Sequence, residues 1–167
     1  MGFEFKLSNS VKGGLIYAAG DTIAVLIVNG FDFSTLSWIR IGGILLIGAT
    51  LYTLEIPNYF KWIDKKLPQS GTGKNAWLRA SMAMLYFNPL WIARHIVFIQ
   101  LLAGGYETIG WTILLTGVIS FAVNIPVSLI ANYLIQNKVG SKHRFLASAI
   151  FSGLMAIYYS LSNVLFT

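Results

Sequence analysis

The chain has 167 residues, of which 56% are hydrophobic and only 11% are charged, and it carries a formal net charge of +6. Soluble domains are about one quarter charged, so this composition predicts an integral membrane protein. The absence of cysteine excludes disulfides, thiolate catalysis and cysteine-ligated metal centres. In a membrane protein, positive charge gathers in the loops at one membrane face. We interpret the charge of this chain in that way, and we expect no nucleic-acid partner.

Five apolar stretches follow one another in a single domain covering residues 1–167. Each is long enough for a membrane-spanning helix of about 20 residues. The N-terminal MGFEFKLSNS lacks a long apolar region, and we expect no cleaved signal peptide. The expected fold is an all-α, polytopic helix bundle, with spans at 11–30, 35–57, 76–103, 108–135 and 145–165.

Loop charge predicts the orientation of these spans. Ten of the twelve lysines and arginines fall before span one, between spans two and three, or between spans four and five, including the start of the following span. The opposite loops carry only Asp32 and Glu107. The positive-inside rule then predicts five crossings with the N-terminus inside, whereas a four-span count would destroy this segregation.

Asp21 lies in the middle of the first apolar stretch, where an unpaired charge is costly. At about 1.5 Å per residue, Asp21 and Arg94 are expected at similar depths, with Arg40 nearer one membrane face. We predict that Asp21 pairs with Arg94, or failing that with Arg40. We interpret the pair as a structural ion pair that fixes the register of the helices. The alternative is that it lines a polar path through the membrane. Glu55 is expected near the inner membrane face, within reach of water and close to Lys61 in sequence.

A few uncharged polar residues also interrupt the spans, some of them beside prolines. They are either a narrow polar interior or hydrogen-bonding contacts between helices. The candidates for a polar interior are Asn88, Gln100, Asn124 and Asn132, with Ser120 and Ser128 in addition. His95 and His143 are far apart in sequence, and we expect neither a metal site nor any cofactor.

The order of several motifs resembles the Mpv-type family of small peroxisomal and mitochondrial inner-membrane proteins. The similar segments are Gly20-Asp21-Thr22-Ile23-Ala24, Arg40 with the glycines up to Gly48, 59–68 (YFKWIDKKLP), Phe87-Asn88-Pro89-Leu90, and Pro126, Asn132-Tyr133, Arg144 and Leu161-Ser162. The chain departs from the family pattern at Val25, around Ala83-Met84 and at Ile125. The resemblance implies a small channel or carrier for small solutes.

Two functions are therefore open. The first is a non-catalytic accessory subunit of a larger membrane complex, such as a respiratory or membrane monooxygenase assembly. Small residues such as Gly14, Ala18 and Thr22 at a spacing of four favour such packing against other transmembrane subunits or copies of the chain. The second is the Mpv-type channel or carrier. The expected location is a prokaryotic cytoplasmic membrane or an organellar inner membrane.

Overall fold

The described part of the chain is built of helices joined by short turns. The computed structural model describes residues 4–68 and 73–165, with side chains at all of these positions except 88–90 and 159–165. The elements are α1 (Leu7–Val28), η1 (Phe33–Thr35), α2 (Trp38–Ile47), η2 (Gly48–Tyr52), α3 (Thr53–Lys66), α4 (Lys74–Ala103), η3 (Tyr106–Thr108), α5 (Trp111–Asn137) and α6 (Ser141–Leu165).

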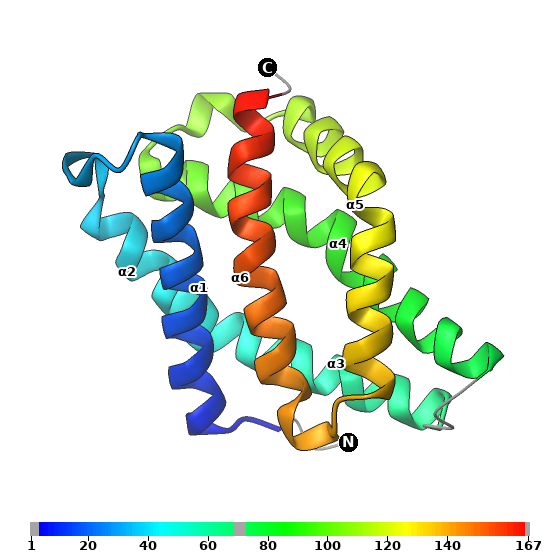
Figure 1. Cartoon of the computed structure of the whole chain (residues 1–167). Coiled ribbons are helices and arrows are strands. Elements are labelled where there is room, and N and C mark those ends of the chain that lie inside the picture. The colour runs from blue at the N-terminus through cyan, green and yellow to red at the C-terminus, as the bar shows by residue number, and fades with distance from the viewer. Residues whose placement is uncertain (1–3, 69–72, 166–167) are drawn as a thin grey trace.

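The helices form two groups that cross each other (Figure 1). In the view drawn, α1, α6 and the later part of α5 stand almost upright, whereas α2–α3 and α4 run obliquely behind them. Helix α1 packs along α6, and α4 packs along α5. The beginnings of α1, α4 and α6 lie at the same end of the bundle as the ends of α3 and α5. That end carries the basic segments expected to share one membrane face.

Four helical segments are long and apolar enough to cross a membrane: Leu7–Val28, Trp38–Lys66, Lys74–Ala103 and Trp111–Asn137. The first four expected spans are therefore confirmed as helices with this capacity. The fifth expected span falls on α6, which is a helix of 25 residues. Its last seven side chains lie outside the described part of the structure.

The second span differs from its expected bounds because Pro57 does not end it. Helices α2 and α3 are joined without a break by the π-helical turn η2, and Pro57 lies inside α3. A proline removes one backbone hydrogen bond from a helix. Next to this gap, Asn58 Nδ2 donates to the Leu54 carbonyl at 2.6 Å. Polar side chains of this kind allow a membrane helix to tolerate proline.

Glycines bring α1 close to its neighbours. A Cβ at Gly13 would stand 2.8 Å from the Gly48 carbonyl oxygen, and a Cβ at Gly20 would stand 2.8 Å from Gly153 Cα. A Cβ at Gly14 would stand 3.2 Å from Ala49 Cβ. Of the small-residue face predicted on the first span, Gly14 is thus used within the chain, against Leu45 and Ala49.

Candidate functional site

A buried ion pair joins α1 to the first turn of α2. Asp21 is 2% exposed, and its two carboxylate oxygens accept hydrogen bonds from Arg40 Nε at 2.8 Å and Nη2 at 2.7 Å. The Arg40 backbone N–H donates to Ser37 Oγ, which caps α2 and fixes the start of the helix. A bidentate arginine–carboxylate pair is both strong and geometrically specific.

The first partner predicted for Asp21 is wrong. Arg94 instead donates from Nη2 to Glu55 Oε2 at 2.7 Å, and Tyr86 Oη donates to the other Glu55 oxygen at 3.0 Å. Depths counted along the sequence treat each helix as perpendicular to the membrane. They also do not tell on which side of a helix a residue lies, and Arg94 lies on the side of α4 that faces Glu55 of α3. Glu55 thus has an arginine partner, whereas Lys61 pairs with Glu4.

Aromatic rings cluster beside this second pair. The π-helical turn contains Tyr52, which is fully buried. Its ring lies 4.0 Å from the Trp91 ring, centroid to centroid, and its hydroxyl lies 3.4 Å from His95 Nδ1. The Arg94 guanidinium lies 5.4 Å from the Tyr52 ring centroid. Single π-helical turns within α-helices are frequent at functional sites, which makes this cluster part of the candidate site.

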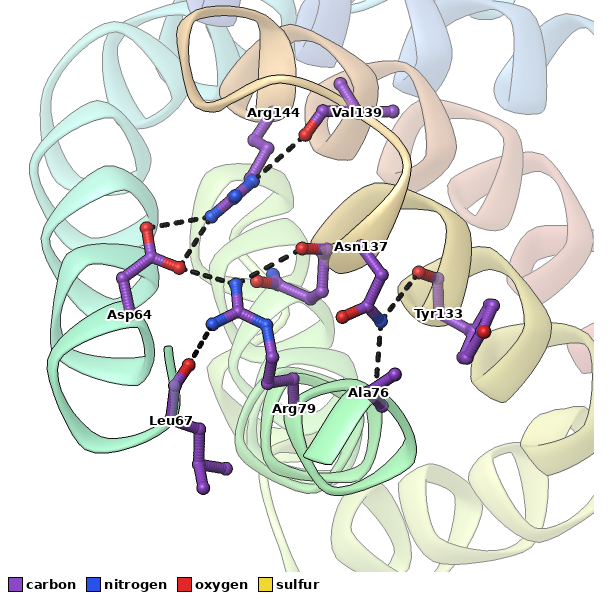
Figure 2. Close-up of polar contacts among 9 residues, drawn as sticks. Asp64, Leu67, Ala76, Arg79, Tyr133, Asn137, Val139 and Arg144 are labelled. Carbon is purple, nitrogen blue, oxygen red and sulfur yellow. Dashed lines mark hydrogen bonds and ion pairs between the residues drawn. The ribbon is translucent and has the colours of Figure 1, made fainter. Parts of the chain in front are cut away.

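A second cluster closes the basic end of the bundle (Figure 2). Asp64 on α3 accepts hydrogen bonds from Arg79 at 2.5 Å and from Arg144 at 2.8 Å. Both arginines are almost completely buried, at 0% and 2% exposed. They also donate to the carbonyls of Leu67, Gln136 and Val139, at or just beyond the C-terminal ends of α3 and α5. These carbonyls carry partial negative charge, so they stabilise the second guanidinium, which one carboxylate cannot neutralise.

The sequence interpretation missed this cluster because it assigned Arg79 and Arg144 to basic loops or loop edges. The sequence nevertheless contained a signal for a buried helix face, because Ala76, Ala80 and Ala83 are spaced by three or four residues. The structure shows that all three are fully buried. Arg79 lies on that same face of α4. Likewise, Arg144 precedes the buried residues Phe145, Ser148 and Ala149 on one face of α6.

A polar stripe runs along the buried side of α5. Its members are spaced by four residues, so each lies beside the next, and the stripe turns around the helix by about 40° at each step. All of them are buried: Ser120, Asn124, Ser128, Asn132 and Gln136. Some bond to one another, as Asn124 Nδ2 does to Ser128 Oγ at 2.9 Å, and Asn124 also reaches Met155 Sδ on α6 at 2.9 Å. The stripe runs from residue 120 to residue 136, or about 24 Å of helix, which is most of the thickness of a bilayer core.

A cavity of about 70 Å³, which Asn132 of this stripe helps to line, lies between α1, α3, α4, α5 and α6. Its walls are mainly apolar and aromatic, and the polar side chains among them are few. These polar groups come from Tyr17, Trp91, His95, Asn132, Ser148 and Ser152. His95 is 8% exposed, and its Nε2 is buried without a hydrogen-bond partner among the described residues. The cavity can hold a few water-sized molecules.

Of the expected polar residues, the structure brings Asn124 and Asn132 to the interior stripe. Gln100 lies apart from them at the end of α4, where its carbonyl accepts the Gly105 N–H at 2.8 Å. The Asn88 side chain lies outside the described residues. Among the residues whose positions are described, His, Cys, Asp and Glu form no group of three that could hold a metal ion.

Comparisons of the chain with protein-family models, curated proteins and solved structures find no match. The Mpv-type resemblance therefore stays a prediction. The chain's own features define its class: a bundle of helices suited to a membrane, with ion pairs and a polar stripe facing inward.

Proposed function

We propose that the chain is a small membrane channel or carrier for small, uncharged polar solutes, with five crossings and the start of α1 on the inner face. The observation that carries the proposal is the buried polar stripe of α5, whose member Asn132 also lines the central cavity. A stripe of this length offers hydrogen-bond partners through most of the apolar layer, where lipid offers none.

The charges favour uncharged solutes. Asp21 and Arg40 neutralise each other, as do Glu55 and Arg94. The cavity itself is lined by hydroxyl, amide, indole and imidazole groups together with apolar rings. Such a lining can hydrogen-bond a small neutral molecule, but it supplies no counter-ion to an ion that has lost its hydration shell.

The packing of the glycines also favours this function over the accessory subunit expected first. Of the face that suggested assembly, Gly14 and Ala18 are buried within the chain. The subunit function is still supported by one surface, the outward side of α2. There a Cβ on Gly42 would meet no atom within 4 Å, and Trp38 and Leu46 are 82% and 62% exposed.

Solute flux into liposomes tests the proposal. Vesicles containing the purified chain should take up glycerol or urea faster than empty vesicles. Ser148→Met, which fills the cavity, should lower the extra flux at least fivefold. The matched control Val127→Met adds the same side chain at a position that is 53% exposed, and it should leave the flux unchanged.

Two results would contradict the channel or carrier function. One is flux equal to that of empty vesicles. The other is an equal effect of both substitutions, which would indicate general damage to the bundle. Migration of the chain in mild detergent at fixed stoichiometry with other proteins would support the subunit function.

A further inference from the structure

A second, larger cavity opens at the basic end of the bundle. Its volume is about 370 Å³, and it lies between the segment before α1, the middle of α3 and the start of α6. Its charged lining contains five lysines or arginines and two carboxylates, a formal excess of three positive charges. These residues are Lys6, Lys12, Lys61, Lys142, Arg144, Glu4 and Asp64.

The two carboxylates are already engaged. Glu4 pairs with Lys6 at 2.5 Å and also with Lys61. Asp64 is shared between the two buried arginines. Lys12 and Lys142 have no carboxylate partner among the described residues, and both are exposed at the cavity. The cavity therefore holds concentrated positive charge that an anion would relieve.

The neutral lining fits the oxygens of a phosphate ester. Ser8, Asn9 and Ser141 supply hydrogen-bonding groups, while Phe60 and Phe145 form an apolar wall. Phosphates are well recognised where cations and hydrogen-bond donors converge. The volume admits a group the size of a glycerophosphate.

The surroundings favour a lipid as the source of this phosphate. Leu7, Val11 and Leu15 lie on successive turns of α1, on the face next to Ser8 and Lys12, and they are 73%, 55% and 59% exposed. An acyl chain can follow this apolar strip when the headgroup occupies the cavity. Basic pockets between transmembrane helices on the inner side of a membrane are known to bind anionic lipid headgroups.

We propose that this cavity binds the phosphate headgroup of an anionic phospholipid. The site goes beyond the proposed function and depends only on the membrane location of the chain. Failure of the flux experiment would not contradict the lipid site. The two cavities are both bordered by α3 and α6, but different residues line them.

The test is titration calorimetry of the whole chain in a non-ionic detergent. Dioctanoylphosphatidylglycerol should bind at least tenfold more tightly than dioctanoylphosphatidylcholine. The pair of changes Lys12→Gln and Lys142→Gln should weaken binding of the anionic lipid about tenfold, because each lysine near a phosphate contributes strongly to such binding. The control pair Lys65→Gln and Lys138→Gln removes the same charge from exposed residues outside the cavity, and it should change the affinity less than twofold.

Three results would overturn the proposal. Equal affinity for the two lipids would exclude headgroup recognition. Equal losses in the two variant pairs would assign the binding to general surface charge. Displacement of the anionic lipid by inorganic phosphate at equal concentration would assign the site to free phosphate and exclude a lipid source.

Discussion

Each carboxylate inside the described α-helices is paired with at least one arginine. Asp21 pairs with Arg40, Glu55 with Arg94, and Asp64 with two arginines. This matching has an energetic reason. A buried pair adds little net stability, but removing one partner leaves a buried charge without compensation. The three groups of charges therefore act mainly by penalising any arrangement of helices that separates them.

Asp21→Asn should reduce stability strongly, because it leaves the Arg40 guanidinium without its carboxylate. The loss is about 3–5 kcal/mol for a fully buried pair, and less here because the Arg40 side chain is 21% exposed. Arg40→Gln should cost a similar amount, and the double variant less than the sum. Unfolding in detergent, followed by circular dichroism, measures these differences.

The control combines Asp21→Asn with Arg94→Gln. Since Arg94 bonds to Glu55 and not to Asp21, the two effects should add within about 0.5 kcal/mol. Additivity for Asp21 with Arg40, together with coupling for Asp21 with Arg94, would contradict the pairing in the structure.

At the level of helices, the sequence predicted which segments are helical, but it did not predict the angles at which the helices cross. Apolar runs of about 20 residues determine the helices locally. The partner of Arg94, by contrast, depends on which side of α4 faces α3, and only tertiary packing decides this. The π-helical turn at Gly48–Tyr52 and the continuation of α3 through Pro57 also have no clear local signal. The polar stripe of α5 was readable from its spacing of four, although only tertiary packing decides that it faces inward.

Two glycine substitutions test the packing of these helices. Gly20→Ala places a Cβ 2.8 Å from Gly153 Cα and 3.0 Å from its carbonyl oxygen, so α1 and α6 must separate. We expect a loss of about 1–3 kcal/mol, as for overpacking in a core. Gly42→Ala is the control, because no atom lies within 4 Å of its Cβ, and it should gain up to about 1 kcal/mol from helix propensity. Thermal unfolding of both variants in one detergent gives the comparison, and equal effects would contradict the close approach of α1 to α6.

The whole molecule has one strongly basic end. The Asp64 cluster and the basic cavity both lie there, at the ends of α3 and α5 and the start of α6. Loop charge predicted that these segments share a side. It did not predict that Arg79 and Arg144 would be buried, because a charge count does not distinguish a side chain in water from one bonded to helix-end carbonyls. The proposed orientation across the membrane thus rests on the lysines that stay exposed.

Single cysteines can test this orientation directly, because the natural chain has none. In sealed vesicles, Lys65→Cys and Lys138→Cys should react with an impermeant maleimide from the same side, since α4 and α5 form two crossings between them. Glu107→Cys, in the turn that joins those helices, should react only from the opposite side. Thr167→Cys should react from the Glu107 side if α6 completes a fifth crossing. Reaction of residues 65 and 138 from opposite faces would contradict the proposed topology. Reaction of residue 167 from the same side as residue 138 would show that the chain crosses the membrane four times and not five.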